Sequence, residues 1–222
     1  MIICKQAWPI VLVNCLAITS VANGTTLIAD FDQFPEGSLD TQFSDNGIQF
    51  SHLEVEALGG TPRFSAERAD ANGWPHVSPP NYLSTFGFFP GPGGGLSQVR
   101  AFRIAPPSAA RSVDIDVFAS IHPEILNRVY TLTAFLGNDV VATQSVVIGE
   151  GTTIVPNFAE HHLFRINRVK FDSLRFSATD GAGNPSAILA ATDNVVIRLV
   201  PEPTARMLTF IAAIFAAGRR RL

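Results

Sequence analysis

Apolar and polar residues alternate over short segments through most of this chain. In the stretch ARSVDIDVFAS, residues 110–120, the aliphatic side chains fall on one face of an extended strand, and Asp114 and Asp116 fall on the other. RVYTLTAFLG, residues 128–137, alternates in the same way, and a Gly-Asn-Asp turn leads into the returning segment VVATQSVVIG. Two such runs joined by a Gly-Asn pair predict a β-hairpin.

The same reading extends to the rest of the chain. We predict strands at residues 27–34, 47–55, 110–120, 128–137, 140–149, 169–178 and 188–200. Residues 23–199 contain no window longer than ten residues with a clean helical period. Strands at this spacing predict an all-β domain, an antiparallel β-sandwich or jelly roll of eight to ten strands.

Residues 59–95 depart from this pattern, because they are rich in Gly, Pro, Asn and Ser. We predict a long loop here, either ordered over the sandwich or a flexible insertion. Its aromatic residues, among them Trp74 and Tyr82, favour an ordered loop. Aromatic faces suit sugar rings, so Trp74 and Tyr82 are the candidate carbohydrate-binding residues.

The N-terminus carries the features of a secretory signal peptide, residues 1–22. Lys5 precedes an apolar run, and small residues at Ser20 and Ala22 supply a cleavage site. This segment predicts a signal helix. The two cysteines of the chain, Cys4 and Cys15, both lie in it, so the mature protein is expected to have neither a disulfide nor a thiol nucleophile.

The charge and the motifs of the sequence argue against several classes of function. Residues 23–200 carry eleven Lys or Arg and eighteen Asp or Glu, a net charge of −7, which leaves no basic stripe for nucleic acid. Gly-x-Ser-x-Gly, phosphate-loop and His-Glu-x-x-His motifs are absent from the sequence. The pair His161-His162 is expected to be a surface loop rather than a metal site, because adjacent strand residues point to opposite faces.

Several carboxylates are candidates for chemistry. Asp30 and Asp32 lie in the first predicted strand and Asp193 in the last; these strands commonly meet at one edge of a jelly roll. Oxygen ligands from both would suit Ca²⁺, so these three residues form a candidate calcium site. Asp114 and Asp116 share one face and leave open a carboxylate pair for glycoside hydrolysis, or a solvated face.

The C-terminal segment, residues 200–222, has three parts in sequence. Val200 leads into Pro201, Glu202 and Pro203, an apolar stretch covers residues 207–217, and Arg219, Arg220 and Arg221 follow. This arrangement resembles the PEP-CTERM sorting signal of Gram-negative bacteria. The resemblance implies export, a transient stay in the inner membrane, and cleavage by an exosortase near Pro-Glu-Pro. It also implies association with exopolysaccharide, biofilm and the cell surface or extracellular matrix.

The apolar stretch of this segment predicts a short transmembrane helix. Eleven residues span about half of a ~30 Å hydrocarbon core, so the anchor is short and transient. The prolines keep the preceding peptide extended and open to a protease.

Two patches of the body resemble members of the same group. They are ADFDQFPEGSLDTQFSDNGIQFS, with Phe43 at the aromatic position, and TDNVVIRLVPEP. The resemblance implies a galactose-binding-like or lectin-like β-sandwich. We therefore expect a non-enzymatic, surface-directed protein that binds exopolysaccharide or serves a structural role in it, the alternative being an extracytoplasmic carbohydrate-active hydrolase that uses a carboxylate pair.

Overall fold

The computed structural model describes residues 24–57, 64–68, 81–88, 96–120, 126–149 and 159–201. The predicted signal peptide, Trp74, and the sorting segment beyond Pro201, with its apolar stretch 207–217, lie outside these ranges, and so do both predicted helices. Every regular element within the described ranges is a strand. No helix there is long and apolar enough to cross a membrane.

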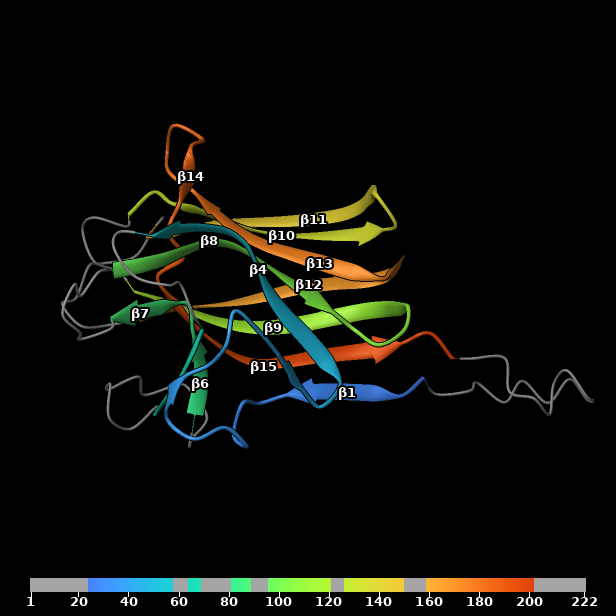
Figure 1. Ribbon diagram of the computed structural model, residues 1–222. Coiled ribbons are helices and arrows are strands. Elements are labelled where there is room, and N and C mark those ends of the chain that lie inside the picture. The colour runs from blue at the N-terminus through green and yellow to red at the C-terminus, as the bar shows by residue number, and fades with distance from the viewer. Residues whose placement is uncertain are drawn as a thin grey trace, which may run out of the picture.

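The described strands form two antiparallel sheets (Figure 1). One sheet has seven strands in the order β12-β9-β15-β6-β5-β2, with β1 paired to β15. Its strands are β12 (Ala159–Phe171), β9 (Ala110–Ser120), β15 (Ala190–Leu199), β6 (Asn81–Ser84), β5 (Ser65–Arg68), β2 (Gly37–Ser38) and β1 (Thr26–Ala29).

The other sheet has eight strands in the order β11-β10-β13-β8-β4-β3, with β14 paired to β13 and β7 to β8. Its strands are β11 (Asp139–Val147), β10 (Val129–Leu136), β13 (Ser173–Thr179), β8 (Leu96–Ala105), β4 (Ile48–Ala57), β3 (Gln42–Asp45), β14 (Pro185–Ser186) and β7 (Phe86–Phe88). The two sheets stack face to face, which confirms the predicted all-β sandwich.

Aromatic side chains in contact with one another occupy much of the core between the sheets. Phe43 stacks on Phe50 with ring centroids 4.9 Å apart, and Phe64 meets Phe102 edge to face at 5.7 Å. Tyr130 is fully buried, and its hydroxyl accepts the Leu189 N–H at 2.9 Å. Burial raises the pKa of Tyr130 to about 12, so the phenol stays neutral. Aromatic rings of both sheets therefore fill the interior.

Two hairpins follow the turn chemistry of their sequences. Gly137 and Asn138 connect β10 to β11, with Gly137 at φ 62°, as the Gly-Asn signal predicts. Asn46 and Gly47 connect β3 to β4 with φ 46° and 84°, the backbone of a type I′ turn. Both turns keep the register that places alternate residues in the core.

The chain also departs from several predictions. The stretch 59–95, predicted as a loop, contains β5, β6 and β7, because Phe64 and Leu83 supply buried side chains to the sandwich. No predicted strand covers β8, and only the last three residues of β12 lie in a predicted strand. Residues 169–178 are two strands rather than one: the chain crosses from one sheet to the other at Asp172.

Each of the two patches that carry the family resemblance contains a residue with a positive φ angle. Phe31 is buried at φ 62°, an uncommon conformation for a bulky residue, and its N–H donates to the buried Asp45 carboxylate at 2.8 Å. Burial raises the pKa of Asp45. Asn194 at φ 47° marks a bulge in β15, where the Asp193 carboxylate accepts its N–H at 2.8 Å.

Candidate functional site

A row of polar side chains crosses the outer face of the eight-stranded sheet. Strand pairing places six residues of successive strands directly opposite one another, so all six share one face. None of the six is buried. From β11 to β3 the row consists of Thr143, Thr133, Arg175, Arg103, Ser51 and Gln42. We call this set the polar row.

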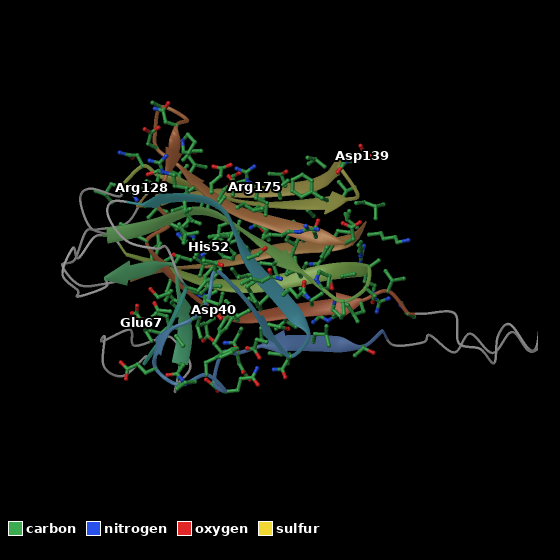
Figure 2. All side chains as sticks on the ribbon, viewed as in Figure 1. Asp40, His52, Glu67, Arg128, Asp139 and Arg175 are labelled. Atoms are coloured by element: carbon green, nitrogen blue, oxygen red, sulfur yellow. The ribbon has the colours of Figure 1, made fainter. Side chains whose placement is uncertain are left out.

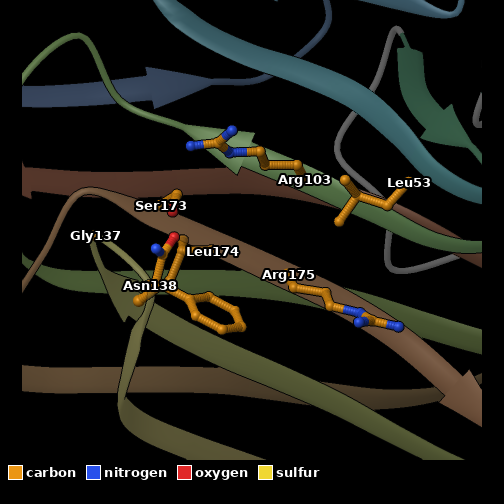
Figure 3. A pocket seen from close by; sticks show the side chains of 8 residues that line it. Leu53, Arg103, Gly137, Asn138, Ser173, Leu174 and Arg175 are labelled. Atoms are coloured by element: carbon orange, nitrogen blue, oxygen red, sulfur yellow. The ribbon is translucent and has the colours of Figure 1, made fainter.

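A pocket of about 300 Å³ opens beside the two arginines of the polar row (Figure 3). Arg175, Arg103 and Leu53 project from the neighbouring strands β13, β8 and β4. The β10–β11 hairpin forms one wall of the pocket. Its lining residues are Leu53, Arg103, Phe135, Gly137, Asn138, Ser173, Leu174 and Arg175. Such a mixture of apolar surface with a few convergent polar groups is typical of a ligand site.

The hairpin wall of the pocket is held by Asp172, at the crossing between the sheets. Its carboxylate accepts the Gly137 N–H at 2.8 Å and the Ser173 hydroxyl at 3.1 Å. Its own N–H donates to the Phe135 carbonyl at 2.9 Å. Two of these hydrogen bonds, those with Gly137 and Phe135, tie the turn that carries Asn138 to Asp172, so this wall is preformed.

The pocket carries excess positive charge. Arg175 forms an ion pair with Glu54 of β4, and both side chains are about two-fifths exposed. Arg103 lies directly opposite Arg175 in the pairing of β8 with β13 and forms no ion pair within the described part of the chain. Figure 2 shows Arg175 over the eight-stranded sheet, with Asp139 at the tip of the β10–β11 hairpin. Glu54 therefore neutralises only one of the two guanidinium groups.

The predicted carboxylate pair lies on the opposite face of the sandwich. Asp114 and Asp116 share the outer face of β9, as predicted, while their aliphatic neighbours are buried. Asp114 pairs with Arg165 at 2.7 Å, and Asp116 pairs with His161 at 2.7 Å. Both carboxylates are thus engaged by side chains of β12, Asp114 by Arg165 and Asp116 by His161, which is an arrangement of a cross-strand ladder rather than of a free acid–base pair.

The two histidines lie in strand β12, and the predicted surface loop is wrong at this point. His161 points outward and stacks on Phe118 with ring centroids 4.7 Å apart. His162 points to the other side, with Nε2 3.3 Å from a Glu160 carboxylate oxygen. Adjacent strand residues face opposite ways, as the sequence argument requires.

Of the two aromatic residues predicted to bind sugar, Tyr82 lies in β6 and Trp74 lies outside the described residues. Tyr82 is 2% exposed, and its hydroxyl donates to Glu67 at 2.8 Å. A sugar ring cannot stack on a side chain that is covered on both faces. In this structure Tyr82 supports the sheet instead of presenting a binding surface.

Pairing of Ala29 in β1 with Val195 in β15 brings the segments of Asp30 and Asp193 side by side, but the predicted calcium residues take part in separate hydrogen bonds. The Asp30 carboxylate accepts the Asp32 N–H at 3.3 Å, and the Asp32 carboxylate accepts the Asn81 N–H at 3.3 Å. Asp193 is buried in β15. Among the described residues, no three His, Cys, Asp or Glu side chains form a group that could hold a metal ion. Calcium at Asp30, Asp32 and Asp193 stays a prediction.

Sequence reasoning missed the arginines of the pocket. Alternation in residues 128–137 groups Phe135 with Thr131 and Thr133 on one face, and the structure shows that this face is the outer one. The pairing of Arg103 with Arg175, however, depends on the register between two strands more than seventy residues apart. An alternating pattern in residues 96–105 would have predicted a strand with Arg103 on one face but not its partner, and the run LSQVRAFRIA does not alternate cleanly.

Comparison with known proteins adds structural neighbours of low similarity. No protein-family model matches the chain, and a sequence search of curated proteins finds no match. Among solved structures, the K1 cleaved adhesin domain of Lys-gingipain from Porphyromonas gingivalis W83 aligns with TM-score 0.45 and 13% identity, over 80% of this chain and 100% of that one.

Two carbohydrate-binding modules align at similar levels. CBM27-1 of Caldicellulosiruptor saccharolyticus, solved with mannohexaose, gives TM-score 0.43 and 13% identity, over 78% of this chain and 97% of the module. TmCBM27, a mannan-recognising module, gives TM-score 0.39 and 14% identity, over 80% and 99%. All of these TM-scores lie below 0.5, and no function is carried over from these neighbours to this chain.

Proposed function

We propose that this protein is an exported β-sandwich that binds polysaccharide on the outer face of its eight-stranded sheet. The observation that carries the proposal is the polar row with the pocket at its centre. Hydroxyl, amide and guanidinium groups are the donors and acceptors that match sugar hydroxyls. Phe135 and Leu53 offer apolar surface beside them for the carbon face of a sugar ring.

The length of the polar row favours a polymer over a single sugar. Six strands at ~4.8 Å spacing extend over about 24 Å. An extended polysaccharide chain lying across the strands would meet one polar side chain per strand. Its central residue would occupy the pocket, where the preformed hairpin wall reduces the ordering cost of binding.

Export and sorting are part of the same proposal. The N-terminal segment would direct secretion, and the Pro-Glu-Pro segment with its apolar and arginine-rich end would hold the chain in the inner membrane until an exosortase cleaves it. The sandwich would then be released to the cell surface or matrix, where exopolysaccharide is present. The protein acts in this account by binding, without catalysis.

The pocket is tested by replacing its aromatic side chain. In Phe135→Ala, the loss of apolar contact should weaken binding of the purified full-length protein to polysaccharides by about tenfold, since a sugar-facing aromatic contributes roughly 1.5 kcal/mol. Affinity gel electrophoresis against a panel of neutral and acidic polysaccharides measures this.

Leu163 supplies the matched control, because it is 40% exposed on β12 of the other sheet and does not line the pocket. Leu163→Ala should retain the mobility shift of the parent protein. Equal retention of binding in Phe135→Ala would place the binding surface elsewhere.

A further inference from the structure

We infer that the pocket selects acidic polysaccharides, by binding the carboxylate of a uronic acid residue at the Arg103 guanidinium. The inference rests on the proposed function and names its ligand class. It starts from the placement of Arg103 and Arg175 directly opposite each other in neighbouring strands. Like charges at such positions repel and destabilise a sheet, so a partner for both is expected.

The protein supplies a partner for only one of the two. Glu54 pairs with Arg175. No Asp or Glu is among the described residues that line the pocket, and the nearby Asp172 carboxylate is already committed to Gly137 and Ser173. Arg103 is exposed and has no ion-pair partner in the described ranges. A ligand carboxylate is the missing counter-charge.

The chemistry of the group fits a carboxylate better than a neutral hydroxyl. A guanidinium presents a planar fork of N–H donors that matches a carboxylate in a two-point, charge-assisted contact. Asn138 lines the same pocket and is exposed, so its side-chain amide offers a neutral hydrogen-bonding group for ring hydroxyls. Phe135 and Leu53 lie in the same lining, so one acidic sugar residue would meet charge, hydrogen bonds and apolar surface together.

The net negative charge of the protein means that an acidic polysaccharide must be bound by short-range contacts. Residues 23–200 carry a net charge of −7, so the long-range field repels polyanions rather than attracting them. Acidic chains must therefore be held by short-range contacts in the pocket. Double-stranded DNA, a polyanion without sugar carboxylates, should not bind.

The test compares polygalacturonate with its fully methyl-esterified form, which has the same backbone without the charge. Titration calorimetry of the full-length protein at physiological ionic strength should give an affinity about tenfold higher for the acid form, as expected for one charge-assisted contact. Arg103→Gln should bring the two affinities within about twofold of each other while binding of the ester persists.

Arg111→Gln is the matched control, because Arg111 is an exposed arginine on β9 of the other sheet. It removes the same charge and should keep the preference for the acid form. An equal loss of preference in both variants would indicate a general charge effect and overturn the inference.

Two further outcomes separate the inference from the proposed function. Equal binding of acid and ester by the parent protein, with both lost in Phe135→Ala, would overturn the selectivity and leave the polysaccharide site in place. Binding of neither polymer, nor of any polysaccharide in the panel, would overturn both.

Discussion

His52 is the residue whose protonation links the stability of the fold to pH most directly. It lies in β4 with its ring 4.1 Å from that of Phe64, and its buried Nε2 atom has no hydrogen-bond partner among the described residues. Burial lowers the pKa of His52 to about 4, below its ordinary value of 6.5. The imidazole is therefore neutral in the folded protein at pH 7.

The sign of the pH effect follows from these two values. Between pH 6.5 and pH 4 the unfolded chain binds a proton that the folded protein does not, so stability is lost as the pH falls through this window. The loss is on the order of 2–3 kcal/mol in free energy of unfolding. Urea denaturation at pH 7 and pH 4.5 should show it in the parent protein.

In His52→Phe this part of the acid sensitivity should disappear, because no titratable group remains at the site. The matched control is His161→Gln, which removes an exposed histidine and should leave the acid-dependent loss in place. An unchanged pH dependence in His52→Phe would show that other groups govern acid unfolding.

Among the elements, the β3–β4 hairpin depends on a single glycine. Gly47 has φ 84°, and the neighbouring Asn46 amide donates to the Ile28 carbonyl at 2.7 Å, which ties the turn to β1. A side chain at Gly47 would be strained whatever the space around it. Gly47→Ala should lower the free energy of unfolding by about 1–2 kcal/mol, measured by urea denaturation.

Gly181 is the matched control, because its φ does not lie in the left-handed region and an added Cβ would meet only ordinary contacts with Asn127. Gly181→Ala should change stability by less than about 0.5 kcal/mol. Equal effects of the two substitutions would remove the conformational explanation.

The elements also show what sequence patterns can and cannot predict. Strict alternation correctly predicted β9 and the β10–β11 hairpin, where one face is buried and the other is not. It failed at residues 169–178, because Phe171 and Leu174 belong to different sheets and both reach the core. Register between distant strands, which brings Arg103 to Arg175, leaves no local signal in the sequence.

The fate of the whole chain is tested at its C-terminus. If the sorting segment is processed, the mature protein from the native host should end near Pro201–Pro203 and lack the three arginines at residues 219–221. Mass spectrometry of the secreted and surface fractions measures this directly. A mature C-terminus that still includes Arg219 to Leu222 would contradict cleavage by an exosortase.

At the scale of the whole molecule, the two faces of the sandwich have different roles in this account. The outer face of the seven-stranded sheet is a ladder of internal ion pairs, such as Asp114 with Arg165. The outer face of the eight-stranded sheet keeps Arg103 and the hydroxyl groups of the polar row available. A ligand should therefore contact one face only.

Hydrogen exchange of the full-length protein, with and without polygalacturonate, tests this claim most directly. The account predicts slower amide exchange on ligand addition in β4, β8 and β13 and at the β10–β11 turn, with β9 and β12 unchanged. Protection confined to β9, β12 and β15, or no protection by any polysaccharide of the panel, would contradict it.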